Sequence, residues 1–189
     1  MDRKKLIQAV TAFKSSDDKR EGLQELLYDA ENKRIVSSDG RRMIIARSLF
    51  EEKYSENCRL DENLFKRGHL VKSGETTFPD YKEIIPSVPN MEDFISMEVP
   101  DWLKDHAKRA TRADIPAVMD RDWKLSLSVN IGENYLDLAL LAPLHGENVR
   151  AFFVKRSVLI EPERDGYGEP EWFIVISLFT ARKTEPAWR

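Results

Sequence analysis

Apolar residues recur at helical spacing near the start of the chain. The stretch Asp2 to Lys14 predicts an amphipathic helix with one apolar stripe: Leu6, Ile7, Val10 and Phe13. Three short runs after it predict strands: Leu23 to Tyr28, Arg34 to Ser37 and Arg42 to Arg47. Asp39-Gly40 between the last two is typical of a tight hairpin, because Gly adopts positive φ at little cost. This part of the chain therefore predicts a helix followed by three strands.

The last sixty or so residues show a similar order of elements. Lys124 to Val129 alternates apolar and polar residues, which predicts a half-buried strand. Glu133 to Ala142 is largely apolar and ends before Pro143, which predicts a short helix. Three further runs predict strands: Asn148 to Val154, Ser157 to Glu161 and Trp172 to Phe179. The two halves share this order without an obvious repeat of residues.

A proline-rich stretch separates the two halves. Phe78 to Pro100 predicts an extended connector that lies along the body of the protein. Asp101 to Ala113 predicts a second amphipathic helix, and the polar tail from Ala181 to Arg189 predicts a frayed end. We therefore expect one domain over residues 1–189, built from module one (about 1–77), a connector with its helix (about 78–123), module two (about 124–180) and a tail (181–189).

Composition fits a folded protein of the cytoplasm. The chain has 189 residues and a net charge of −3, which suits one large domain or two small ones. No apolar run approaches the roughly 18 residues that a membrane span needs, and the first residues lack the apolar stretch of a signal peptide. The one cysteine, Cys58, excludes an internal disulfide and is compatible with a reducing compartment.

Catalytic machinery is not evident in the sequence. His69, His106 and His145 lie far apart, and none has a partner at metal-ligand spacing. Cys58 lies in a polar stretch, which predicts a surface thiol and not a nucleophile. Nucleophile-elbow, P-loop and dinucleotide-binding motifs are also missing. We therefore expect a non-enzymatic protein without a metal or cofactor.

The basic residues are more informative. Residues 2–20 hold six cations against three anions, and the predicted helix after Asp101 adds four more: Lys104, Lys108, Arg109 and Arg112. Such residues can follow a phosphate backbone without reading bases. The residues alone also allow the plainer interpretation that these are solvated helix faces.

Two stretches and the C-terminal half resemble a known family. The hairpin from Ile35 to Met43, the segment Thr77 to Pro86 with its Phe-Pro-Asp-Tyr, and the run from Tyr135 through Glu147-Asn148-Val149 to Ile176 resemble bacterial DNA sliding clamps, the beta subunit of DNA polymerase III. The resemblance implies an α+β, clamp-like domain of two modules, each a helix with antiparallel strands, with curved sheets outside and the helices on one face. It also implies a role in DNA replication, or in a mobile element's version of it.

Candidate sites follow from the resemblance together with the charge pattern. The resemblance assigns duplex DNA contact to the first helix, with Arg3, Lys4, Lys5 and Lys14. The charge pattern adds Arg41 of the hairpin and the basic helix after Asp101, which the family pattern does not locate: Lys104, Lys108, Arg109 and Arg112. Replication proteins carrying clamp-binding peptides would dock at a pocket that includes Ile176 and Leu178. The second inner helix, Glu133 to Ala142, departs from the family because it carries two acids and no cation.

The length of the chain leaves the assembly open. It suffices for one clamp domain, so a six-domain ring would need six copies. We expect self-association through the sheet edges formed by Trp172 to Phe179 and a strand of the N-terminal half. Two alternatives remain: a clamp-fold interaction module or regulator that does not bind DNA, and an enzyme of unrecognised type.

Overall fold

The computed structural model describes residues 1–17, 19–48, 50, 54–87, 94–99, 101, 134–135, 138–154, 157–163, 170–177 and 179–180. Its helical elements are α1 (Arg3–Ala12), η1 (Glu21–Gln24), α2 (Glu62–Lys66), η2 (Lys82–Ile84) and η3 (Leu138–Leu144), where η denotes a 3-10 helix. Its strands are β1 (Leu27–Asp29), β2 (Arg34–Ser38), β3 (Arg42–Arg47), β4 (Cys58–Leu60), β5 (Lys72–Gly74), β6 (Ile95–Glu98), β7 (Asn134–Tyr135), β8 (Asn148–Val154), β9 (Ser157–Pro162), β10 (Trp172–Ser177) and β11 (Phe179–Thr180).

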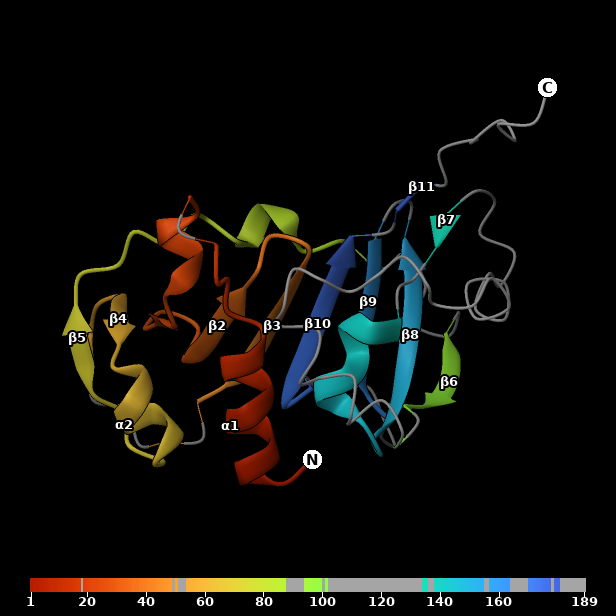
Figure 1. The fold of residues 1–189 in the computed structure, drawn as a ribbon, viewed down its shortest axis with the longest axis horizontal. Helices are drawn as coiled ribbons and strands as arrows, with labels where there is room; N and C mark the ends of the chain where they lie inside the picture. Colours follow the sequence, from red (N-terminus) through yellow and green to blue (C-terminus); the bar gives the residue numbers. More distant parts are fainter. Residues whose placement is uncertain are drawn as a thin grey trace.

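Nine of the described strands form one antiparallel sheet in the order β5-β4-β1-β2-β3-β10-β9-β8-β6. The N-terminal strands make up one half and the C-terminal strands, with β6, the other, and the halves meet where β3 pairs with β10 (Figure 1). Ile44 pairs with Ile174 at this join. The α+β, clamp-like class predicted from the sequence is confirmed, with α1, α2 and η3 on the same face of the sheet (Figure 1).

The main core lies between the sheet and the helices. Successive side chains of a strand point to opposite faces, so alternate residues of β2, β3 and β10 reach the helix side. Ile35, Ile44 and Ile174 pack there with α1 residues and with Leu141 and Leu144 of η3. Because both halves contribute to this single cluster, they share one hydrophobic core.

A smaller apolar cluster covers the opposite face of the sheet. It joins Val36 and Val175 of the strands to Tyr81, with Phe78 and Ile85 packed against it. The Tyr81 hydroxyl donates a hydrogen bond to Asp29 of β1. The start of the predicted connector therefore lies along the body of the protein, as the sequence indicates.

Several local predictions are wrong in detail. Leu23 to Tyr28 begins as the 3-10 turn η1 and is a strand only in β1. Glu133 to Ala142 holds β7 and the first part of η3, which continues to Leu144. Pro143 inside η3 lacks the amide hydrogen that the interior of an α-helix requires. The connector from Phe78 to Pro100 is not extended throughout, since it holds η2 and the strand β6, which pairs with β8. The predicted helix after Asp101 and the strand Lys124 to Val129 lie outside the described residues, Asp101 apart.

Of the two predicted edges for self-association, the one at Trp172 to Phe179 is wrong. Trp172 to Phe179 divides into β10 and β11, and β10 lies between β3 and β9 with antiparallel partners on both sides. A strand that is hydrogen-bonded on both sides cannot accept another chain. Among the described strands, the outer positions of the large sheet are taken by β5 and β6.

Candidate nucleic-acid interface

Helix α1 buries its apolar stripe in the core and leaves its cationic face exposed. Asp2 caps the helix by accepting a hydrogen bond from the Lys5 amide at 2.8 Å. Leu6, Ile7, Ala9 and Val10 are buried against the sheet. The remaining face leaves Arg3, Lys4 and Gln8 exposed.

A second, shorter helix lies beside α1. Asp61 caps α2 by accepting a hydrogen bond from the Leu64 amide at 2.9 Å, and Phe65 anchors the helix in the core. Gly68 follows the helix at φ +84°, a conformation that favours glycine, and its amide donates to the Phe65 carbonyl. This turn leaves Lys66 and Arg67 exposed next to α1.

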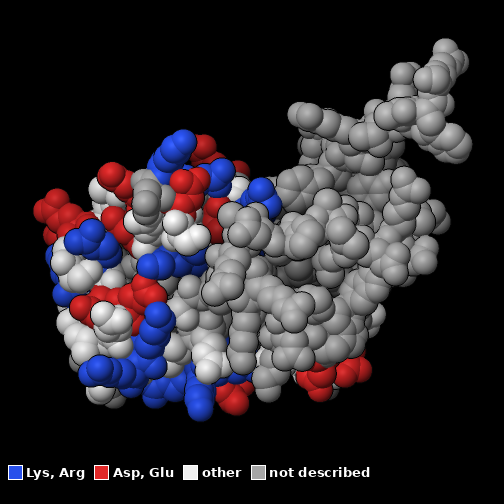
Figure 2. All heavy atoms as spheres, in the orientation of Figure 1, with Lys and Arg blue, Asp and Glu red and all other residues white. Residues whose placement is uncertain are grey.

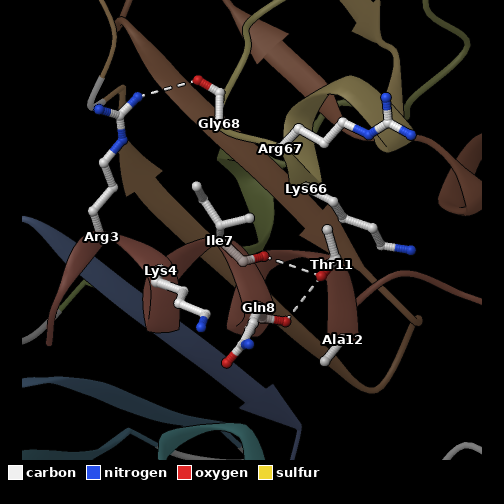
Figure 3. Close-up of a pocket in the computed structure, with 9 residues that line it drawn as sticks. All are labelled: Arg3, Lys4, Ile7, Gln8, Thr11, Ala12, Lys66, Arg67 and Gly68. Atoms are coloured by element: carbon white, nitrogen blue, oxygen red, sulfur yellow. Dashed lines mark hydrogen bonds between the residues drawn. The ribbon is translucent and has the colours of Figure 1, made fainter.

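An open groove of about 900 Å³ runs between the two helices (Figure 3). Its described lining comprises four cations, two polar residues, two apolar residues and a glycine, and no carboxylate: Arg3, Lys4, Lys66, Arg67, Gln8, Thr11, Ile7, Ala12 and Gly68. In the space-filling view, Lys and Arg side chains gather along the lower edge of the face, over α1 and α2 (Figure 2). The described lining of the groove is therefore cationic.

Arg3 fixes one end of the groove. Its guanidinium donates a hydrogen bond to the Gly68 carbonyl at 3.2 Å and lies 4.4 Å from the centre of the Phe50 ring. Thr11 directs its hydroxyl to its own helix, 3.0 Å from the Ile7 carbonyl oxygen. Because Arg3 links α1 to the turn after α2, the two walls are held together (Figure 3).

Solved structures show which fold carries this groove. The DNA polymerase III beta chain from Streptococcus pneumoniae matches with a TM-score of 0.58 and 13% identity, over 94% of this chain and 62% of that one. The DNA polymerase sliding clamp from Pseudomonas aeruginosa matches with a TM-score of 0.57 and 13% identity, over 94% of this chain and 64% of that one. The fold is that of a bacterial sliding clamp. The DNA polymerase III beta subunit from Borrelia burgdorferi, solved in complex with a natural product, matches with a TM-score of 0.56 and 14% identity. The match covers 94% of this chain and 61% of that one.

The sliding-clamp likeness is one of structure. Neither a protein-family model nor a curated protein sequence matches this chain. The chain spans less than two thirds of the length of the three solved clamps. Because the sequence identity is only 13–14%, the likeness establishes the fold alone.

The clamp fold separates the predicted α1 cations into two groups. Arg3 and Lys4 line the groove. Lys5 instead reaches Glu147, with its Nζ 2.7 Å from Oε1, and Lys14 forms an ion pair with Glu62 of α2. Sequence reasoning placed all four on one DNA-contacting helix, and the structure brings only the first two to the groove.

The Glu62 carboxylate joins Lys14 to the rim of the groove. Lys66 Nζ lies 2.5 Å from Glu62 Oε1, while Lys14 contacts the other oxygen. Burial alone would raise the pKa of Glu62, but hydrogen bonds from the two lysines hold it below its ordinary value. Glu62 is therefore a carboxylate at neutral pH and balances part of the charge of Lys66.

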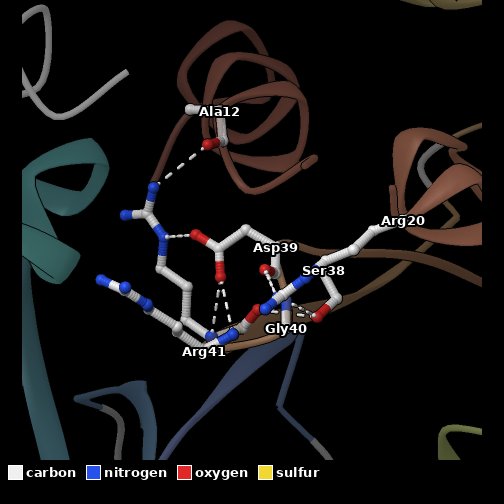
Figure 4. A network of polar contacts seen from close by, with 7 residues as sticks. Ala12, Arg20, Ser38, Asp39, Gly40 and Arg41 are labelled. Atoms are coloured by element: carbon white, nitrogen blue, oxygen red, sulfur yellow. Dashed lines mark hydrogen bonds and ion pairs between the residues drawn. The ribbon is translucent and has the colours of Figure 1, made fainter. Parts of the chain in front are cut away.

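The hairpin that carries Arg41 closes the other end of α1 (Figure 4). The buried Arg42 places its Nε 2.9 Å from Asp39 and donates from Nη2 to the Ala12 carbonyl at 3.2 Å. Gly40 has φ +84°, as the Asp-Gly turn predicts. Arg41 itself is exposed at the tip, and it does not line the groove.

The remaining predicted site residues have mixed outcomes. Ile176 is fully buried in the main core. The peptide pocket that the resemblance assigns to Ile176 and Leu178 stays a prediction. Five further candidates lie outside the described residues: Lys104, Lys108, Arg109, Arg112 and Leu178.

The surface thiol predicted at Cys58 is wrong. Cys58 begins the short strand β4 and is fully buried, and this burial raises the pKa of its thiol.

His145 Nδ1 lies 3.6 Å from Asp101, and the described part of the chain contains no group of three potential metal ligands. No described helix is long and apolar enough to cross a membrane.

Lys66 and Arg67 are the groove residues that sequence reasoning missed. The signal for them was present, because Asp61 is a good N-cap residue and Glu62 and Lys66 have the i,i+4 spacing of a helical ion pair. The helix is five residues long, which is too short for an apolar stripe to become visible.

Proposed function

We propose that this chain is a non-enzymatic, clamp-type protein that contacts duplex DNA without reading its sequence, in DNA replication or a mobile element's version of it. The observation that carries this proposal is the α1–α2 groove, whose described lining has four cations and no carboxylate. Lysine and arginine on such a surface bind phosphates by releasing counterions, which requires no base contact. The clamp fold supports it, since the matched structures are clamps of DNA polymerase III.

Lys4 offers a direct test. It is exposed, and its side chain has no ion pair or hydrogen bond within the described residues. Lys4→Glu should weaken binding to a short duplex and lower the slope of log affinity against log salt by about one or more. Fluorescence anisotropy at several salt concentrations measures both quantities.

The matched control is Lys82→Glu. Lys82 is an exposed lysine of η2 on the opposite face of the sheet, and this variant has the same net charge as Lys4→Glu. The control should bind like the wild type. Equal weakening by the two variants would show a dependence on net charge only, and no duplex binding at low salt by the wild type would end the proposal.

Partners and assembly belong to the same proposal. Peptides of replication proteins would dock at a pocket near Ile176 and Leu178, and copies of the chain would join through the outer strands β5 and β6. Light scattering with and without duplex DNA tests the assembly. A monomer in both conditions contradicts ring formation and leaves DNA contact by a single copy.

A second candidate function is a clamp-fold interaction module that does not bind DNA. It is favoured by η3, whose sequence from Leu138 to Leu144 has no charged residue, and by the ion pairs that occupy Lys5 and Lys14. The same anisotropy titration separates the two functions, because this one predicts no binding at low salt.

A further inference from the structure

We propose that the outer strand β6 binds an extended, basic segment of another protein as an additional strand of the sheet. This inference goes beyond the proposed function, because it concerns the edge of the sheet and not the α1–α2 groove. It rests on the backbone of Ser96 and Glu98, on the exposed apolar side chains beside them and on the acids at the same edge.

Strand β6 turns part of its backbone outward. Among the described strands it pairs with β8 alone, with Ser96 opposite Arg150 (Figure 1). The Val99 amide, just after β6, donates to the Glu147 carbonyl at 2.9 Å. Hydrogen-bonded pairs alternate along an antiparallel ladder, so Ser96 and Glu98 point their amide and carbonyl groups away from β8. Such outward groups are a template for a further strand.

Apolar side chains flank this backbone on both faces of the sheet. Phe94, directly before β6, is 38% exposed, and Ile95 is 37% exposed. The Phe94 ring is held 5.8 Å from the ring of Phe152, and the Arg150 guanidinium lies 5.1 Å from its centre. Because successive residues of a strand point to opposite faces, an added strand gains an apolar contact on each face.

The charges at this edge favour a basic partner. Glu98 is exposed within the strand, Glu163 accepts a hydrogen bond from the Ser96 hydroxyl at 2.9 Å, and Asp101 is 86% exposed just beyond β6. The Arg150 side chain beneath them is only 7% exposed. Lysine or arginine side chains on an incoming strand therefore complement the acids that they meet.

A second copy of this chain fits the edge less well. Two β6 strands side by side would bring the same acids together, and like charges oppose strand pairing. The other outer strand, β5, is protected: the Tyr54 hydroxyl accepts a hydrogen bond from the Lys72 amide at 2.8 Å, and the pairing with β4 shifts register next to Arg59. Arg59 Nε also donates to the Ser73 hydroxyl at 3.2 Å. Short, bulged and covered strands do not readily accept another chain.

The experiment measures the affinity of the full-length protein for a short probe peptide in which lysine and valine alternate and both ends are capped. Ser96→Pro should lower this affinity about tenfold or more, because proline removes the outward amide and its ring obstructs the edge. Proline is tolerated in an edge strand where the amide faces solvent. The matched control, Ser96→Ala, keeps the amide and loses only the hydroxyl, and it should bind like the wild type.

The charge preference has its own matched variants. Glu98→Gln should weaken binding of the lysine–valine peptide a few-fold, because one acid of the edge is lost. Glu83→Gln makes the same charge change at η2 and should leave the affinity unchanged. A peptide with glutamate in place of lysine should not bind, and equal affinity for the two peptides would overturn the choice of a basic segment.

Amide hydrogen exchange of the wild type gives a second readout that needs no variant. The bound peptide should slow exchange of the Ser96 and Glu98 amides, because it accepts their hydrogen bonds. Binding without this protection would be adhesion to an acidic surface and would overturn the inference. If circular dichroism shows that Ser96→Pro does not fold, the exchange measurement decides.

The outcomes separate this inference from the proposed function. Wild-type affinity for the peptide in Ser96→Pro overturns the role of β6. An assembly of wild-type copies that Ser96→Pro dissolves would show a second copy at β6, which overturns the inference and agrees with the proposed assembly. Duplex binding should be the same in the wild type and Ser96→Pro, since the described lining of the α1–α2 groove does not include β6.

Discussion

Helix α1 and the segment η3 occupy comparable places in the two halves of the molecule and differ in what they present to solvent. Both lie on the same face of the sheet and bury apolar side chains in one core, Leu6 and Val10 from α1, Leu141 and Leu144 from η3 (Figure 1). Helix α1 leaves Arg3 and Lys4 exposed beside a groove. The sequence of η3 contains no charged residue.

This difference shows that the fold and the phosphate-binding surface depend on separate sets of residues. The buried positions are apolar in both halves, because burial of apolar surface stabilises the shared core. The exposed positions contribute little to stability, so one half can carry cations while the other does not. Stability experiments can therefore test whether the two halves contribute equally to the shared core. These experiments do not depend on any binding surface.

The largest expected effect concerns an ion pair of the C-terminal half. Arg150 of β8 and Glu161 of β9 form a buried pair across neighbouring strands, and their side chains are 7% and 2% exposed. Glu161→Ala should cost about 3–5 kcal/mol in the free energy of unfolding, because it leaves the guanidinium buried without its counter-charge. Urea unfolding at neutral pH measures the loss.

A double replacement provides the control for this ion pair. Arg150→Met/Glu161→Leu removes both charges and should recover most of the lost stability. If Glu161→Ala unfolds near the wild-type urea midpoint, the pair does not hold the C-terminal half together.

A matched pair of leucine truncations compares the two helical positions directly. Leu6 of α1 and Leu141 of η3 are 3% and 0% exposed in the same core. Leu6→Ala and Leu141→Ala should each cost about 2–5 kcal/mol, since each leaves a cavity of similar size. Urea unfolding of the two variants is compared, and a much smaller loss for Leu141→Ala would mean that η3 is a lesser part of the core.

On the opposite face of the sheet, a hydrogen bond of Tyr81 tests the smaller apolar cluster, which contains residues of both halves. The Tyr81 hydroxyl donates to Asp29, and Tyr81 lies in the cluster that contains residues of both halves. Tyr81→Phe should cost about 1.5–3 kcal/mol at neutral pH, because the lost hydrogen bond is made to a charged group. Denaturant unfolding gives the difference from the wild type.

Acid should diminish that difference. Burial would raise the pKa of Asp29, but hydrogen bonds from Tyr81 and Asn32 lower it. A lowered pKa stabilises the protein above the unfolded value of about 3.9, and this contribution is lost as the pH falls through the folded value. A cost of Tyr81→Phe that does not diminish as the pH falls through the folded pKa of Asp29 would contradict the role of the ionised Asp29.

The smallest expected effect belongs to the ion pair that joins α1 to the turn after η3. Glu147 lies 2.7 Å from Lys5 and 3.0 Å from the amino group of Met1. Glu147→Gln should cost about 1 kcal/mol at neutral pH, because the pair is partly exposed. Thermal unfolding at pH 7 detects this loss.

The same variant has a pH dependence of known sign. Burial would raise the pKa of Glu147, but hydrogen bonds from Lys5 and the terminal amine lower it. Its contribution is therefore present above the unfolded value of about 4.3 and disappears as the pH falls through the folded value. Equal stability of wild type and Glu147→Gln at pH 7 would remove this link between the halves.

The sequence predicted elements with a strong local signal. The spacing of Leu6, Ile7 and Val10 located α1, and Asp39-Gly40 located the hairpin of β2 and β3. Strand β8 was predicted with its correct bounds, and five of its seven residues are apolar. The family resemblance supplied the arrangement of these elements, which periodicity alone does not determine.

Tertiary packing decided the features that were missed. The four residues of β6 give no strong local signal for a strand, and the segment is a strand because it pairs with β8. Cys58 lies in a polar stretch of sequence and is buried because β4 adds to the edge of β1. The groove depends on α2 lying beside α1, which no local pattern around Lys66 reveals.

The position of β10 in the sheet has a consequence for the order of folding. Ile44 and Ile174 pair directly although they are 130 positions apart, and such distant pairing slows folding. Until β10 has left the ribosome, β3 is an unpaired edge with apolar residues on both of its faces. Translation products that end before β10 should therefore associate with one another through this edge.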